Sequence, residues 1–176
     1  IRFGGKVLGI CGGFQMLGNH IHDPLGSEGE SGSSEGLSLL NVQTTLTNEK
    51  LLFNREGRLS FNDAFVSGYE IHTGLSEGEA CKNAFLHYQL ENDTHADGAI
   101  SDCGNIAGSY WHGLFESPDA LKTILAWAGL KSQATPHFAN IREQQIDRLA
   151  DAVEANMDMN KVLSLLNVKT QDIVQQ

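Results

Sequence analysis

The reactive side chain with the most distinctive surroundings is Cys11, which stands between glycines in the stretch Gly9-Ile10-Cys11-Gly12-Gly13. A thiolate is a strong nucleophile, and flanking glycines permit a sharp strand-to-helix turn that holds such a group outward. The start of a helix also offers unpaired N–H groups that favour an anion. We therefore interpret the stretch as a nucleophile elbow in which the Gly12 N–H points towards the oxyanion of an acyl intermediate. The alternative is a small apolar cysteine packed in a glycine-rich turn.

A cysteine nucleophile needs a base or an ion-pair partner, and His112 is the histidine best placed to serve. It follows an expected strand at residues 106–110 and precedes Gly113, so its side chain is presented at a strand end. His20 and His22 resemble part of a metal site, but no further ligand pattern follows them, and we expect no metal. Surface or satisfied polar positions are the simpler interpretation for His87, His95 and His137.

Composition and charge exclude several classes of function. The chain carries 12 Lys+Arg against 22 Asp+Glu, a net charge of −10, without a basic and aromatic cluster that could follow a phosphate backbone. Its apolar runs are far shorter than the ~20 residues that span a bilayer. The cysteines lack C-x-x-C spacing, which indicates reduced thiols. We therefore expect a cytoplasmic protein with neither a nucleic-acid nor a membrane partner.

The elements that must position Cys11 and His112 alternate between strand and helix patterns. The sequence predicts a strand at 6–10, a helix at 13–20, a mobile acidic loop at 22–36, and strands at 41–46, 64–72, 84–89, 98–101 and 106–110. Residues 102–105 are expected to form a hairpin turn, so these pairings should be antiparallel or mixed. A helix at 120–128 ends at Gly129, and amphipathic C-terminal helices cover about 138–167, with Asp158 as a cap.

The elbow resembles the Gly-x-Cys-x-Gly-x-Gln signature of class I, or triad, glutamine amidotransferases, matched here at Gly9, Cys11, Gly13 and Gln15. Further blocks, in the same order, are similar to the C-terminal half of the cobyric acid synthases, the glutamine-dependent amidotransferases of cobalamin biosynthesis. The blocks lie at residues 23–40, 68–74, 97–101, 108–116 and 142–153. The resemblance implies an α/β fold with a flavodoxin-like sheet and flanking helices, in one glutamine amidotransferase domain over residues 1–176.

The resemblance also implies a reaction in two halves. Cys11 attacks the side-chain amide of glutamine, His112 protonates the departing ammonia, and water hydrolyses the glutamyl thioester. The ammonia then passes to a synthetase domain of the same protein that uses ATP and Mg to amidate corrinoid carboxylates, while this part of the chain needs no cofactor. The residues implied to bind substrate are Gly12, as an oxyanion donor, together with Gln15, Tyr69, Glu70 and His72.

Two departures from the class pattern stand out. The class pairs its histidine with a glutamate two residues later, where this chain has Leu114, so Glu116 or Glu70 would have to orient His112. The first strands of the family and a glycine-rich loop that gives a second oxyanion N–H are not found before the elbow. We therefore expect an N-terminally truncated fragment, with little glutaminase activity alone and an open sheet edge that favours self-association.

Several alternatives stay open at the level of sequence. The chain could be the glutaminase half of a related a,c-diamide synthase or of an amidotransferase acting on cell-wall precursors, although the block at 142–153 favours cobyric acid synthase. It could be a non-catalytic, amidotransferase-like docking domain, against which the presence of both Cys11 and His112 argues. A cysteine peptidase-like hydrolase is the third alternative, and Gln15 argues against it.

Overall fold

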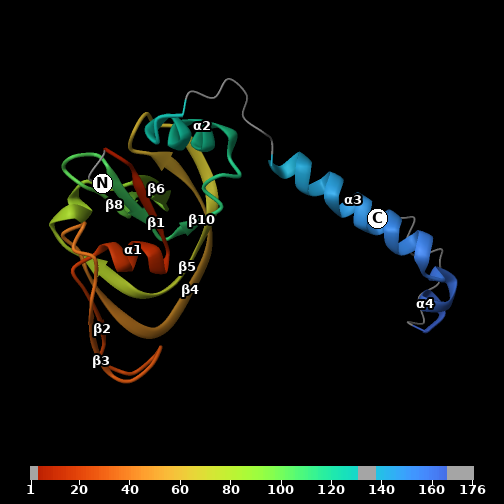
Figure 1. Cartoon of the computed structure of the whole chain (residues 1–176), viewed down its shortest axis with the longest axis horizontal. Helices are drawn as coiled ribbons and strands as arrows, with labels where there is room; N and C mark the ends of the chain where they lie inside the picture. The colour runs from red at the N-terminus through yellow and green to blue at the C-terminus, as the bar shows by residue number, and fades with distance from the viewer. Residues whose placement is uncertain (1–3, 131–137, 166–176) are drawn as a thin grey trace. The chain divides into compact units, whose positions relative to one another are not determined.

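The computed structural model describes residues 4–130 and 138–165 of the chain. The chain divides into two compact units, Ile1–Thr135 and Pro136–Gln176. The sequence predicts a single domain over residues 1–176. The first unit combines a small sheet, a larger and strongly curved sheet, and flanking helices (Figure 1). The α/β fold class predicted from the sequence is confirmed.

The small sheet carries the elbow. Its strands are β1 (Val7–Ile10), β9 (Ile106–Ser109) and β8 (Ala99–Ile100), in the order β1-β9-β8. Strand β1 runs parallel to β9 with Ile10 opposite Ser109, and β8 runs antiparallel to β9 through the predicted turn. Helix α1 (Gly12–Leu17) follows β1 directly and buries Phe14 and Leu17. The predicted strand, sharp turn and helix are confirmed, but the helix is shorter than predicted because His20 already belongs to the next strand.

The larger sheet contacts the elbow through hydrogen bonds from Cys11 and Gln15. Its order is β10-β5-β4-β2-β3, and β6 pairs with both β4 and β7. Strands β4 and β5 form a long curved antiparallel hairpin (Figure 1). The bounds are β2 (His20–Asp23), β3 (Gly32–Glu35), β4 (Gln43–Leu59), β5 (Phe65–Glu77), β6 (Leu86–Leu90), β7 (Asp93–Asp97) and β10 (Trp111–His112). A short 3₁₀ helix, η1 (Glu79–Lys82), follows β5.

The prediction of a loop over all of residues 22–36 is wrong in part, because residues 22–23 and 32–35 lie in strands. Strand β3 pairs antiparallel with β2, with His20 opposite Glu35 and Asp23 opposite Gly32. At the tip, the Asp23 carboxylate accepts the N–H groups of Ser27 and Glu28 at 2.8 and 2.9 Å, which lowers the pKa of Asp23. Strand pairing uses backbone groups, so exposed glycine and serine can form a ladder without any apolar surface to bury.

The core of the first unit lies on both sides of residues 109–114. One cluster centres on Trp111, Leu114 and Phe85 and includes Ile124 of helix α2 (Pro118–Trp127). The other contains Phe14 of α1 and Tyr110. Leu114 is fully buried, so the position two residues after His112 belongs to the core. As predicted, the second helix ends before Gly129, which adopts a φ of 92°.

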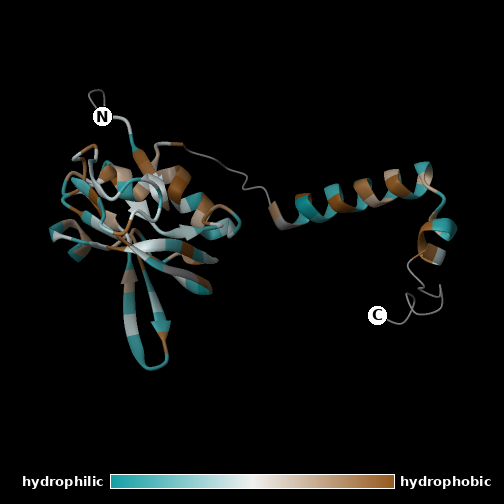
Figure 2. Ribbon diagram, turned by 90° about the horizontal axis from the view of Figure 1, so that it is seen from below, coloured by the Kyte–Doolittle hydropathy of each residue, from teal (hydrophilic) through white to brown (hydrophobic). Residues whose placement is uncertain are grey.

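The second unit consists of α3 (Phe138–Asn156) and α4 (Met159–Leu165). The N–H of Lys161 donates to Asp158 Oδ1 at 3.1 Å, which confirms the predicted cap. Hydrophobic and hydrophilic residues alternate along α3 (Figure 2), and Ile146 and Leu149 are exposed. Of the helices that the structure describes, none combines the length and apolarity needed to cross a membrane.

The two glycines that flank Cys11 are expected to tolerate a methyl group very differently. A Cβ at Gly9 would lie 2.6 Å from both Gly13 O and Leu17 Cδ1, whereas a Cβ at Gly13 would meet open space. Gly9→Ala should therefore lower the free energy of unfolding by about 2 kcal/mol. Gly13→Ala, the matched control, should leave it unchanged or raise it by up to about 1 kcal/mol. Urea denaturation measures both, and equal effects would contradict the packing described here.

Candidate active site

Cys11 occupies a strained backbone conformation at the turn between β1 and α1. Its φ is 55° and its ψ is −118°, in a region that non-glycine residues rarely adopt. Such a conformation costs about 1–3 kcal/mol and persists only where surrounding contacts impose it. Here the Cys11 N–H donates to Ser109 O at 2.9 Å, and α1 begins at the next residue, Gly12. The first N–H groups of a helix have no acceptor within it, so the backbone beside the thiol is rich in donors.

Cys11 and His112 both contact one short segment of β5. The thiol Sγ donates to Ile71 O at 3.3 Å. His112 lies on β10, which pairs with β5 so that His112 is opposite Tyr69 and Trp111 is opposite Glu70. The nucleophile and the imidazole predicted from sequence are therefore placed against residues 69–71 of the same strand.

The imidazole of His112 is held by stacking. Its ring lies parallel to that of Tyr69, with 5.0 Å between centroids and 5° between planes. Tyr69 is 41% exposed, so this pair stands at the surface. Within the part of the chain that the structure describes, the buried Nε2 of His112 has no hydrogen-bond partner. A buried nitrogen without a partner is uncommon in folded proteins, and such groups occur at functional sites.

Gln15 ties the elbow helix to the larger sheet. Its Nε2 donates to Thr73 O at 3.2 Å and to the Tyr110 hydroxyl at 3.3 Å. The same hydroxyl lies 2.5 Å from Ser76 Oγ, and Tyr110 is buried. The donors of the Gln15 amide are thus engaged within the protein, between α1 and β5.

Glu70 and His72 project from the face of β5 opposite that of Tyr69, because side chains alternate along a strand. His72 Nδ1 donates to Gly74 O at 2.9 Å, and its Nε2 donates to Glu70 Oε1 at 2.8 Å. Glu70 Oε2 also accepts from Arg55 Nε at 3.3 Å. The hydrogen bond from His72, with the neighbouring charges of His72 and Arg55, lowers the pKa of Glu70 against the opposing effect of burial.

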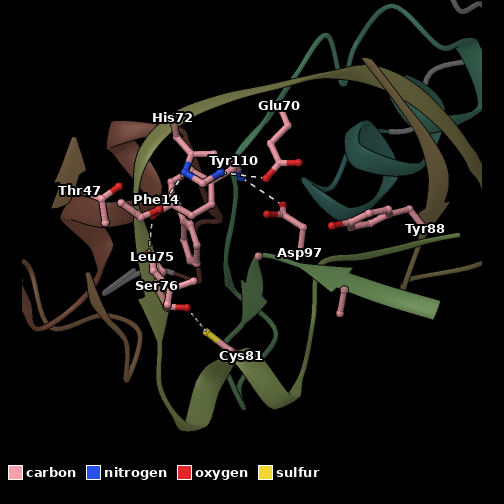
Figure 3. Close-up of a pocket in the computed structure, with 13 residues that line it drawn as sticks. Phe14, Thr47, Glu70, His72, Leu75, Ser76, Cys81, Tyr88, Asp97 and Tyr110 are labelled. Atoms are coloured by element: carbon pink, nitrogen blue, oxygen red, sulfur yellow. Dashed lines mark hydrogen bonds and ion pairs between the residues drawn. The ribbon is translucent and has the colours of Figure 1, made fainter. Parts of the chain in front are cut away.

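A cavity of about 390 Å³ lies on this second face (Figure 3). Glu70, His72 and Tyr110 line it together with Asp97. The rings of His72 and Tyr110 stack at 3.8 Å between centroids. Neither Cys11 nor His112 is among the described residues that line this cavity. Of the predicted substrate-binding residues on β5, Tyr69 thus projects from one face of the strand, and Glu70 and His72 project from the other.

Asp97 belongs to this arrangement, and sequence reasoning assigned it no role. Its Oδ2 accepts from Ser109 Oγ at 2.5 Å and from the Tyr110 N–H at 3.1 Å. Burial raises the pKa of Asp97 to about 6, although both hydrogen bonds oppose the rise, and the charge of Glu70 adds to it. An aspartate before a glycine is typical of a turn, so no local signal marks this residue. Its role depends on strands that lie far apart in the sequence.

The two acceptors considered for His112 differ in their surroundings. The carboxylate of Glu70 is bonded to His72 and Arg55. Glu116 is exposed, and its N–H donates to Gly113 O at 2.9 Å, closing a turn directly after His112.

The raised pKa of Asp97 predicts a pH dependence of stability. A pKa of about 6 in the folded chain, against 3.8 for an ordinary aspartate, means that the folded state holds a proton that the unfolded state releases. The free energy of unfolding should therefore fall by about 3 kcal/mol as pH rises from about 4 to about 7. Asp97→Asn removes this pH dependence of the free energy of unfolding. It keeps the contribution of Glu70, whose lowered pKa makes stability rise with pH. Urea denaturation of both proteins across this range isolates the effect, and parallel curves would contradict it.

One known protein family matches most of this chain. The model of the CobB/CobQ-like glutamine amidotransferase domain matches residues 1–120. The match covers more than half of the chain and includes the elbow, the segment of β5 beside it and His112. Glutamine is the substrate of such domains, and they are enzymes. The chain belongs to the CobB/CobQ-like glutamine amidotransferase domain family.

Proposed function

We propose that the chain is the glutaminase half of a cobyric acid synthase, with Cys11 as the nucleophile and His112 as the general acid and base. One observation carries the proposal: a strained cysteine at a strand-to-helix turn lies against the same segment of β5 as a histidine whose Nε2 has no partner among the described residues. Strain at a reactive side chain and a buried nitrogen without a partner are both features of functional sites.

We propose the following reaction for these two side chains. His112 takes the thiol proton, and Cys11 Sγ attacks the side-chain carbonyl carbon of glutamine while the Gly12 N–H stabilises the oxyanion. His112 then returns the proton to the departing nitrogen, which leaves as ammonia. Water, deprotonated by His112, hydrolyses the thioester to glutamate and restores the thiol. The net reaction converts glutamine and water into glutamate and ammonia.

The residues proposed to contact glutamine contribute in different ways. Tyr69 is exposed beside His112 and offers a surface for the substrate. Gln15 fixes α1 on β5, and through it the position of the Gly12 N–H. In Glu70 and His72, the polar atoms are already paired with one another and with Arg55 and Gly74, so we assign them to the support of the pocket wall.

The ammonia released in this half is proposed to serve a second half-reaction. We propose that a synthetase domain of the same protein, with ATP and Mg, activates a corrinoid carboxylate that the ammonia then amidates. The related a,c-diamide synthases carry out the same chemistry on other carboxylates, and the similarity of residues 142–153 favours the cobyric acid synthases. The identity of the corrinoid that is amidated distinguishes the two.

The thiol assignment predicts selective labelling. Diazo-oxonorleucine, an electrophilic glutamine analogue, should modify Cys11 and neither Cys81 nor Cys103, as read by peptide mass spectrometry. In the full-length enzyme, Cys11→Ser and His112→Asn should each lower glutamine hydrolysis by about 100-fold or more, because each removes a group that reacts directly. Cys81→Ser and Cys103→Ser are the matched controls and should keep their turnover. Labelling at either of those two residues would contradict the proposal.

A second prediction concerns the group that orients His112. We propose Glu116, since Leu114 is a core residue and the carboxylate of Glu70 is bonded elsewhere. Glu116→Gln should slow glutamine hydrolysis by about tenfold or more, because the imidazole loses an anionic acceptor. Glu79→Gln, another exposed glutamate, paired with Lys82, serves as the control. Unchanged turnover in Glu116→Gln would exclude this role for Glu116.

A further inference from the structure

We propose that Asp97 is a positioning residue for glutamine hydrolysis: its carboxylate fixes residues 109–111, which connect the backbone of Cys11 to the imidazole of His112. This inference rests on the proposed function, because it assigns a role within that reaction. It identifies a residue outside the pairing of cysteine and histidine on which their geometry depends.

One carboxylate oxygen of Asp97 accepts hydrogen bonds from two consecutive residues of the segment 109–111. Asp97 Oδ2 accepts both the Ser109 hydroxyl at 2.5 Å and the Tyr110 N–H at 3.1 Å. The oxygen of the Ser109 hydroxyl in turn accepts the N–H of Trp111 at 3.1 Å. Ser109 and Trp111 are fully buried, so these polar groups have no access to water that could replace a lost acceptor. The position of Oδ2 therefore determines the path of the backbone through residues 109–111.

That segment is linked at one end to the nucleophile and at the other to the imidazole. Ser109 O accepts the N–H of Cys11 at 2.9 Å, at the strained turn itself. His112 follows Trp111 directly, and the pair forms the short strand β10 against Tyr69 and Glu70. A displacement of Ser109 would therefore move Cys11 and His112 relative to one another. Misplacement by about 1 Å is enough to cost a large part of catalysis.

Asp97 can serve as a support because it is itself fixed. Its carbonyl oxygen accepts the N–H of Phe85 at 3.0 Å, where β6 begins. The next residue, Gly98, has a φ of 74°, and a Cβ there would collide with Gly108 O. Only glycine allows the backbone after Asp97 to approach β9 so closely. This approach brings the carboxylate to Ser109.

The charges that face Asp97 come from several elements. Glu70 and His72 face it from β5 and are paired with one another, and Tyr88 of β6 and Cys81 of η1 lie close enough to sense its charge. Burial raises the pKa of Asp97 to about 6, so at pH 8 the group is ionised and Oδ2 can accept both bonds. Asp97 lines the cavity that Cys11 and His112 do not line, so it acts through residues 109–111.

Two variants distinguish the loss of the hydrogen-bond acceptor at Asp97 from the loss of its negative charge. Asp97→Leu removes the acceptor at similar volume, and Asp97→Asn keeps one oxygen that can take both bonds. In the full-length enzyme at pH 8, Asp97→Leu should lower kcat for glutamine hydrolysis by about 30-fold or more, with KM within about threefold. Asp97→Asn should keep kcat within about threefold of wild type. Wild-type kcat in Asp97→Leu, or equal losses in both variants, would overturn the proposal.

Further measurements keep the test decisive. If circular dichroism shows that Asp97→Leu does not fold, Ser109→Ala removes the hydroxyl link and should lower kcat by about tenfold or more at unchanged KM. Wild-type kcat in Ser109→Ala would then overturn the proposal. Cys11→Ser is measured alongside. Activity that survives Cys11→Ser contradicts the proposed function itself, whereas inactive Cys11→Ser with fully active Asp97→Leu contradicts only the role of Asp97.

Discussion

The close approach of α1 to β1 and β9 is the constraint on which the rest of the structure depends. Gly9 and Gly108 face the helix, and a Cβ on Gly108 would collide with the ring of Phe14. This approach buries Phe14 and Leu17, and it forces the chain to reverse direction at Cys11. The cost of the strained φ at Cys11 is thus offset by packing on either side, and the thiol stays turned towards β5.

Strand β5 gives this arrangement two distinct faces. The ring of Tyr69 stacks on the imidazole of His112, and the backbone oxygen of Ile71 accepts the hydrogen of the Cys11 thiol. The side chains of Glu70 and His72 project from the opposite face to Tyr69 and are joined by a hydrogen bond of 2.8 Å that is largely removed from water. Such a bond fixes geometry, because water has little access to replace it. Strand β5 therefore contacts the two reactive groups through Tyr69 and a backbone carbonyl, and it lines the cavity through Glu70 and His72.

The sequence predicted those parts that depend on neighbouring residues. The elbow follows from glycines beside Cys11, and the place of His112 follows from a strand that ends just before it. Asp97 and the hydroxyl of Tyr110 could not be found in this way, since their partners lie on other strands. The hairpin of β2 and β3 was missed for a related reason: its exposed side chains carry no hydrophobic alternation, and its pairing resides in the backbone.

The burial of Leu114 explains why this chain departs from the class pattern two residues after His112. Its side chain is fully buried in the cluster that contains Trp111, and a carboxylate there would lose its hydration without gaining a partner of opposite charge. The parallel ring of Tyr69 and the backbone that precedes the histidine therefore support the orientation of His112, together with the acceptor proposed at Glu116. That backbone is held by Asp97 through Ser109 and Tyr110. In this chain the buried carboxylate thus acts on the main chain before the imidazole, where the class places one after it.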